Sequence, residues 1–317
     1  GSIRGTSWKQ RWKGVEAEMI EQYLQALAAA LAGADPALVQ DALYDAEEYL
    51  RAEFAACPEG DEACVAAVLE RYGTPEEVAA AYLETEVTVA RALQAPPRPE
   101  PANAAGRFFG VVADPRSYGA FFYLVLSLVT GIVYFTLVAS LLPTGLGLLP
   151  IGVGVLVLLL FFGMVRAISL AEGRLVETML GVRMPRRPRP GAPEGDIPSR
   201  IKQWFTDWRT WTSILYMILQ LPLGIIYFTI VTVAVTLSAT GVVYPIAQMF
   251  TDYPLLQWGG YGYLLEPWAA PLVMAAGVLG FVLTLHLCRG IGALHAVYAK
   301  AMLVGRFADT TRSADDR

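Results

Sequence analysis

The sequence contains two long apolar runs that match each other at a fixed spacing. One run follows Asp114-Pro115-Arg116 and the other follows Asp207-Trp208-Arg209, and each residue of the first has its counterpart 93 positions later. An internal repeat of segments this long and apolar predicts two copies of a membrane-embedded helical hairpin. The counterparts include Tyr123 and Tyr216, Gly131 and Gly224, and Tyr134 and Tyr227.

Composition supports a membrane protein with a soluble head. The chain has 317 residues, of which 55% are hydrophobic and only 17% charged, too few charges for an ordinary soluble surface. Residues 117–165 carry no charge, and residues 210–288 carry no lysine or arginine. Residues 15–95 instead hold seventeen acids and three arginines. The charges therefore divide the chain into an acidic head and an apolar body.

The apolar body predicts four membrane-spanning helices, near residues 118–142, 151–168, 211–237 and 269–288. Each is long enough to cross a hydrocarbon core of ~30 Å, where only a helix satisfies its own backbone. The predicted fold class is all-α: a small N-terminal helical bundle plus a four-helix transmembrane bundle built from two tandem two-helix repeats. Parallel repeats favour a pseudo-two-fold axis along the membrane normal.

We divide the chain at changes of composition. The expected parts are a basic-aromatic tail (1–14), the acidic helical domain (15–95), a proline-rich linker (96–106), the first hairpin repeat (107–190), a connection (191–206), the second hairpin repeat (207–306) with an outer insertion (238–268), and a polar tail (307–317). The first tail suits either a lipid headgroup surface or a disordered solvated segment.

The distribution of basic residues predicts the orientation. Nine lysines or arginines lie between residues 166 and 209, and none lies in the turn near residue 146 or in residues 238–268. By the positive-inside rule, the head, the central connection and the C-terminus lie in the cytoplasm. We therefore expect a multi-pass protein of the bacterial inner membrane, with both termini cytoplasmic.

The head carries clear helix-boundary signals. Asp35-Pro36 is typical of an N-cap followed by proline in the first turn, and Gly33 and Gly73 end helices. Thr74 followed by Glu77 is a capping-box pattern. Cys57 and Cys64 suit a disulfide if the head is extracellular, or half of a metal site. Compartment rules favour two ordinary reduced cysteines in a cytosolic head.

The acidity of the head limits its partners. Seventeen acids repel phosphate backbones, so we expect no direct nucleic-acid binding. An acidic helical face could dock a basic protein, or it could only keep the head soluble. The candidate partner-binding face comprises Asp41, Asp45, Glu47 and Glu48.

The head resembles the HAAS domain family. The resemblance rests on the leucine-rich segment and acidic helix of residues 21–51 and on the turn Tyr72-Gly73-Thr74-Pro75-Glu76-Glu77-Val78-Ala79. It covers about 70 residues and implies a cytoplasmic signalling adaptor, often encoded beside PadR-like winged-helix repressors. Residues 57–63 lengthen the usual spacing between the second and third helices.

The body resembles the actinobacterial-type "putative sensor" membrane domain, found in front of some histidine kinases. The matching features are the Asp-x-Arg lead-in, the Tyr and Gly-hydrophobic-hydrophobic-Tyr-Phe run, the glycine-rich turn after Pro143, and the exit of residues 166–181. The second repeat departs from this exit, with His295 and Val297 where Glu172 and Arg174 lie in the first. No kinase follows, so any output passes through the head or another chain.

Two further sets of residues are candidate sites. Aromatic residues and two acids in and beside the outer insertion suit a cationic or amphipathic ligand through cation–π contacts, anchoring among lipid headgroups, or docking to another membrane protein. Asp114, Arg166, Asp207 and Arg289 suit inter-helix ion pairs, unless each arginine extends alone to the interface. The outer set is Tyr244, Phe250, Asp252, Tyr253, Trp258, Tyr261, Tyr263, Glu266 and Trp268.

No pattern in the sequence predicts an enzyme, a cofactor or a metal site. His286 is the only histidine within a predicted span and suits a packed or hydrogen-bonded role, while His295 is expected beyond the span in the cytoplasm. We expect a membrane signalling protein whose head relays an envelope or lipid stimulus to a cytoplasmic partner such as a PadR-like regulator. The alternative is a structural accessory subunit that packs against other membrane subunits, such as a transporter. A weaker alternative is a lipid carrier.

Overall fold

The computed structural model describes residues 4–58, 61–93, 103–187, 205–251, 254 and 256–304. The chain forms two compact units. Unit 1 comprises Gly1–Arg98, Arg183–Thr206 and Val304–Arg317, and unit 2 comprises Pro99–Val182 and Asp207–Leu303. Helices make up almost all of the described chain, which confirms the predicted all-α class.

The head in unit 1 contains four helices: α1 (Arg4–Ala30), α2 (Pro36–Ala56), α3 (Glu62–Tyr72) and α4 (Pro75–Leu93). Residues 4–14, which we separated from the head as a tail, are the first part of α1. The boundary signals are confirmed. The Asp35 carboxylate accepts the Ala37 N–H at 2.8 Å. Thr74 and Glu77 form the reciprocal capping box, at 2.9 and 3.3 Å.

The apolar stripes of these helices form one core. Tyr72 packs on Tyr49 with ring centroids 4.6 Å apart and on Tyr23 at 5.7 Å. The Tyr23 hydroxyl donates to the Gly73 carbonyl at 2.9 Å, and burial raises the pKa of Tyr23 to about 12. The buried core residues include Ile20, Leu27, Leu31, Leu43, Leu50, Phe54, Val65, Val68 and Ala79.

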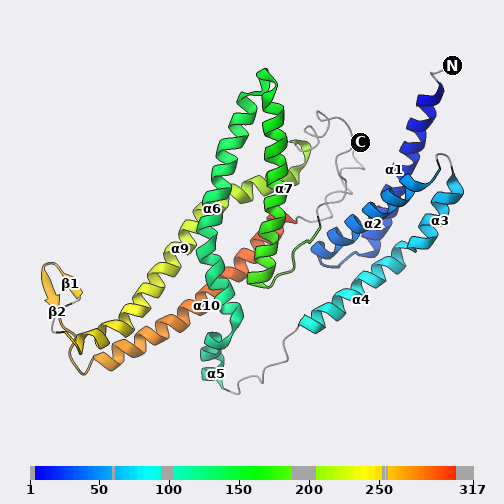
Figure 1. Ribbon diagram of the computed structural model, residues 1–317. Helices are drawn as coiled ribbons and strands as arrows, with labels where there is room; N and C mark the ends of the chain where they lie inside the picture. The colour runs from blue at the N-terminus through cyan, green and yellow to red at the C-terminus, as the bar shows by residue number, and fades with distance from the viewer. Residues whose placement is uncertain are drawn as a thin grey trace. The chain divides into compact units, whose positions relative to one another are not determined.

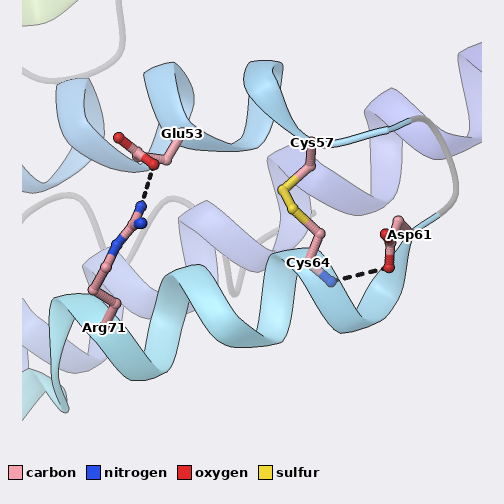
Figure 2. Close-up of a disulfide and its surroundings, with 5 residues drawn as sticks. All are labelled: Glu53, Cys57, Asp61, Cys64 and Arg71. Atoms are coloured by element: carbon pink, nitrogen blue, oxygen red, sulfur yellow. Dashed lines mark hydrogen bonds and ion pairs between the residues drawn. A yellow bond between two sulfur atoms is a disulfide. The ribbon is translucent and has the colours of Figure 1, made fainter.

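The expectation of two reduced cysteines in the head is wrong. Cys57 and Cys64 form a disulfide, with their Cα atoms 5.9 Å apart (Figure 2). The bond joins the end of α2 to the first turn of α3, where the Asp61 carboxylate caps the Cys64 N–H at 3.0 Å. Because the lengthened connection between these helices brings the two Cβ atoms within bridging range, a spacing of seven residues suffices for a bond.

Unit 2 contains four long apolar helices: α6 (Pro115–Gly147), α7 (Val153–Leu180), α9 (Trp208–Gln248) and α10 (Ala270–Leu303). All four are long and apolar enough to cross a membrane. In Figure 1, α6 and α7 form one antiparallel hairpin, and α9 and α10 form a second that crosses it. The short helices α5 (Ala104–Phe109) and η1 (Gly110–Ala113) precede α6.

Each of the four helices extends beyond the predicted span. Asp114 and Asp207 cap α6 and α9 by accepting the N–H two residues later, both at 3.0 Å. The first hairpin does not turn at Pro143, because α6 continues through this proline to Gly147. The turn follows at η2 (Leu149–Ile151) and Gly152, whose φ of +82° is accessible to glycine. Hydropathy located the apolar part of each helix, and aspartate caps set the first residues of α6 and α9.

Two glycines related by the repeat allow the hairpins to cross closely. A Cβ added to Gly131 of α6 would lie 2.8 Å from the Leu221 Cα, and a Cβ added to Gly224 of α9 would lie 2.8 Å from the Leu128 Cα. Each glycine thus packs directly against the backbone of the other helix, α6 against α9 and α9 against α6. Small residues at helix crossings drive association in lipid by permitting such an approach.

The connection between α9 and α10 carries the described strands. α9 continues to Gln248, so the first eleven residues of the expected insertion are helical. β1 (Leu256–Trp258) pairs antiparallel with β2 (Tyr261–Tyr263), with Leu256 opposite Tyr263. Gly259 and Gly260 connect them at φ +60° and +83°, as a tight hairpin turn requires.

Replacement of Gly131 or Gly224 by leucine should destabilise unit 2. Each added side chain would meet the backbone of the facing helix and separate the hairpins, at a cost of ~1–3 kcal/mol or more. Thermal unfolding of the full chain in mild detergent measures the loss. Gly163→Leu on α7 is the matched control, since a Cβ there meets no atom within 4 Å. Equal unfolding temperatures for all three variants would contradict the crossing.

Candidate functional site

The interior of unit 2 contains a cluster of polar side chains, which we call the Glu–His–Tyr cluster. One of the four long helices, α7, carries the acidic residue Glu172, and the other three surround it. The members are Glu172 from α7, His295 from α10, Tyr123 and Tyr134 from α6, and Tyr216 and Tyr227 from α9. Glu172 has no exposed surface and His295 is 1% exposed, so the centre of the cluster is closed to solvent.

Glu172 accepts three tyrosine hydroxyls. Tyr123 and Tyr216 donate to its Oε1 at 2.6 and 2.9 Å, and Tyr134 donates to its Oε2 at 2.6 Å. Hydrogen bonds to an ionised group contribute about 1.5–3 kcal/mol each. Three of them are comparable with the penalty of several kcal/mol for burying a carboxylate. In the described chain, the donors that reach Glu172 are hydroxyls rather than cations.

His295 joins the same hydroxyls from the opposite side. Its Nε2 lies 2.7 Å from the Tyr123 hydroxyl and 3.1 Å from that of Tyr216. Its Nδ1 lies 3.2 Å from the Tyr227 hydroxyl. Both ring nitrogens therefore have partners, and the histidine is connected to Glu172 through two tyrosine oxygens.

The cluster follows the sequence repeat. Tyr123 and Tyr216 are repeat counterparts, as are Tyr134 and Tyr227, and Glu172 occupies the position that His295 has in the second copy. The pseudo-two-fold relation therefore brings an acid and a base to equivalent places about one pair of tyrosines. The hydroxyls of Tyr123 and Tyr216 lie 3.5 Å apart.

Sequence reasoning found these residues but not their assembly. We placed the ends of the second and fourth spans before Glu172 and His295, and expected His295 in the cytoplasm. The structure instead places both in helices that continue to Leu180 and Leu303, with buried side chains. The repeat alignment pairs Glu172 with His295, and this pairing was the feature of the sequence that indicated the site. The other histidine, His286, contacts the Phe108 carbonyl at 2.9 Å.

A second polar site lies in unit 1, on the acidic face of α2. Residues 183–187, which we call the arginine segment, contact this face. The Asp41 carboxylate accepts the backbone N–H groups of Arg186 and Arg187, both at 2.8 Å, and lies 3.5 Å from the Arg183 guanidinium. Burial raises the pKa of Asp41, and the two N–H groups and Arg183 only partly oppose this shift.

Further contacts hold the arginine segment along its length. Arg187 pairs with Asp45 at 2.9 Å, and Arg183 pairs with Glu86 of α4. The Tyr82 hydroxyl donates to Asp45 at 3.0 Å, and burial raises the pKa of Tyr82. Met184, between the arginines, is fully buried. The segment is therefore bound by charge, backbone hydrogen bonds and apolar burial together.

The predicted acidic face is thus divided. Asp41 and Asp45 contact the arginine segment. Glu47 pairs with Arg51 one turn later on α2, and Glu48 is exposed. In the described part of the chain, Asp41 and Asp45 are the members of the set that bind the arginine segment.

The structure shows one of the expected inter-helix ion pairs, between Asp114 and Arg289. Arg289 donates to the Asp114 carboxylate at 3.0 Å, which joins α10 to the cap of α6. Asp207 caps α9 and also accepts the Thr210 hydroxyl at 3.4 Å. Arg166 is a half-buried residue of α7.

The outer aromatic set does not form one described site. Phe250, Tyr261 and Trp268 are 83%, 73% and 71% exposed, whereas Tyr244 is buried. Glu266 is exposed. Trp258 and Tyr263 belong to the two strands, and Asp252 and Tyr253 lie outside the described residues. Across the described chain, no three His, Cys, Asp or Glu side chains gather as metal ligands.

Comparison with known families agrees with both resemblances. Residues 22–81 match the HAAS family model. Residues 123–303 match the family model described as "Putative sensor", a range that includes most of α6, all of α7, α9 and α10, and the whole Glu–His–Tyr cluster. Comparison with curated proteins and with solved structures gives no match. Because the second match covers more than half of its 317 residues, the chain belongs to the "Putative sensor" family.

Proposed function

We propose that this protein is a non-enzymatic membrane sensor that relays the state of its helix bundle through the head to a protein partner. The observation that carries the proposal is the binding of the arginine segment to Asp41 and Asp45. This segment begins three residues after the end of α7, so the membrane body is covalently continuous with the acidic site of the head. The two family matches support a role in membrane signalling.

In the proposed relay, a change in the position of α7 alters the binding of the arginine segment to Asp41 and Asp45. α7 contributes Glu172 to the buried cluster and ends at Leu180, followed by Gly181 at φ +73°. Only two residues then separate α7 from Arg183, too few to absorb a shift of one helical turn (5.4 Å) without strain. A displacement of that size would draw the Arg183 guanidinium and the backbone N–H groups of Arg186 and Arg187 away from the Asp41 carboxylate.

The proposed partner is a basic cytoplasmic protein. Release of the arginine segment would expose Asp41 and Asp45, which are complementary to another basic surface. The resemblance to HAAS domains makes a PadR-like regulator the leading candidate. The basic residues between positions 166 and 209 support a cytoplasmic head. The Cys57–Cys64 disulfide is a bond more usual in oxidising compartments, and thiol labelling of intact cells tests the orientation of the head directly.

One observation favours a second function. Met249, Phe250, Tyr261 and Trp268 expose 71–83% of their surface at the outer end of the second hairpin. Exposed aromatic residues suit either lipid headgroups or another membrane subunit. A structural accessory subunit would use this surface rather than the head.

Co-purification from native membranes in mild detergent distinguishes the two functions. The relay predicts that a basic soluble protein is recovered with the full chain and lost when residues 15–93 are deleted. It also predicts that Asp41→Ala/Asp45→Ala changes the recovered amount at least about threefold, because loss of one buried charge partner costs more than 1 kcal/mol. Recovery of the same membrane subunits with and without the head would instead favour the accessory role.

Thiol labelling tests the hold of the arginine segment. In Met184→Cys, the introduced thiol should react slowly with a maleimide in permeabilised cells, because residue 184 is fully buried. Adding Asp41→Ala/Asp45→Ala should accelerate labelling about tenfold or more, since two anchoring carboxylates are lost. Glu48→Ala is the matched control, an exposed acid on the same helix, and should leave the rate unchanged.

The same variants report orientation. With a membrane-impermeant maleimide, the thiol at position 184 in the double alanine variant should react only after cells are permeabilised. Reaction in intact cells would contradict a cytoplasmic head. Equal labelling rates for the double alanine and Glu48→Ala variants would contradict the role of the arginine segment.

A further inference from the structure

We propose that the Glu–His–Tyr cluster is a proton-binding site, loaded through Tyr227, and that its proton is a signal the bundle reads. The proton-binding site does not depend on the function proposed above. Only the idea that its proton is a signal rests on that function. The site itself follows from four residues that form a continuous hydrogen-bonded chain. They run from Tyr227 through His295 and Tyr123 to Glu172, with steps of 3.2, 2.7 and 2.6 Å.

This chain of hydrogen bonds can exist with either polarity. In the unloaded form, Tyr227 donates to Nδ1 of neutral His295, Nε2–H donates to the Tyr123 oxygen, and Tyr123 donates to the Glu172 carboxylate. In the loaded form, the protonated Glu172 donates to Tyr123, Tyr123 donates to Nε2, and Nδ1–H donates to Tyr227. Each internal donor and acceptor remains paired in both forms, as burial demands.

The two forms differ by one proton. A proton arriving at Nδ1 converts neutral His295 into an imidazolium, and Tyr227 becomes an acceptor. Nε2 can then release a proton to Tyr123 as Tyr123 transfers its own to the Glu172 carboxylate. The result is a neutral acid and a neutral imidazole, with no other bond made or broken. The negative charge of the unloaded cluster is removed.

The surroundings favour a proton over a larger ligand. Glu172, Tyr123, Tyr216 and His295 are at most 2% exposed and contact one another directly through hydrogen bonds. Among the described residues of the helices packed against α7, the hydroxyls of Tyr123 and Tyr134 from α6 and of Tyr216 from α9 contact Glu172, and His295 and the ring of Tyr298 from α10 lie behind them. Tyr227 ends the chain of hydrogen bonds and is the one member of the cluster that is not buried, and we assign it as the entry group on these two grounds.

Loading would loosen the contact between helices. The carboxylate accepts three hydroxyls from α6 and α9, whereas the neutral acid donates one of its bonds and accepts more weakly. Because Glu172 lies eight residues before the end of α7, this change occurs in the helix that leads directly to the arginine segment. Protonation and the relay would be coupled through α7.

Infrared difference spectroscopy of the full chain in lipid nanodiscs tests proton binding directly. Lowering the pH should produce the C=O band of one protonated buried carboxyl group, because the loaded form carries the added proton on Glu172. The band should be absent in Glu172→Gln. His295→Gln should move its midpoint by about one pH unit or more, because the chain of hydrogen bonds is interrupted. Tyr227→Phe should slow its appearance after a pH jump at least about tenfold, since the entry group is lost.

Two variants serve as controls. Tyr298→Phe removes a hydroxyl that has no hydrogen-bond partner among the described residues, although its ring stacks on Tyr216 at 5.3 Å. His286→Gln removes the histidine outside the cluster. Both should titrate as the wild type does. A band that persists in Glu172→Gln, or no titrating band in the wild type, would overturn the proton site.

Labelling at position 184 separates the two halves of the proposal. If the proton is the signal, the labelling rate in Met184→Cys should follow the infrared midpoint and lose its pH dependence in Glu172→Gln. If the band titrates and the labelling rate does not, the proton site stands and its coupling to the relay is refuted. If labelling is unaffected by Asp41→Ala/Asp45→Ala, the relay fails independently of proton binding.

Discussion

The burial of one carboxylate within an apolar helix bundle constrains the rest of unit 2. Glu172 cannot remain charged there without donors, and three tyrosine hydroxyls from two neighbouring helices supply them. These hydroxyls reach it only if α6 and α9 cross closely, which the reciprocal contacts at Gly131 and Gly224 permit. The polar cluster and the glycine crossing are therefore parts of one packing solution. In lipid, where apolar burial gives little preference between helices, such polar contacts and close approaches decide which faces meet.

Duplication explains why the acid and the base of the cluster occupy equivalent positions, and divergence of the second repeat explains why they differ. A symmetric pair of glutamates around Tyr123 and Tyr216 would place two negative charges close together in a low dielectric, at high cost. Histidine at the second position instead supplies a group that can donate to the shared hydroxyls. The second repeat has His295 where the first has Glu172, and this difference gives the buried site both an acid and a base.

The sequence predicted the class of fold, both family resemblances and the caps of the head, because these depend on local patterns such as Thr74 and Glu77. It did not predict the ends of the long helices, since α7 and α10 continue through polar residues that hydropathy excludes. It also did not predict the disulfide, because that bond depends on how the connection between α2 and α3 folds. The acidic face was recognised, but its occupant lies about 145 residues away, and no local pattern joins Asp41 to Arg186.

Exchange of the two titratable residues tests the central claim, that the repeats build one pseudosymmetric cluster. Glu172→His and His295→Glu, made singly, should each lower the unfolding temperature of the detergent-solubilised chain, because two bases or two acids would then share one pair of tyrosines. The double exchange should recover most of the loss, since each residue moves to its repeat counterpart with an equivalent set of hydroxyls. Recovery of at least about half of the summed destabilisation is the result we predict. Strictly additive losses would show that the two positions do not form one site.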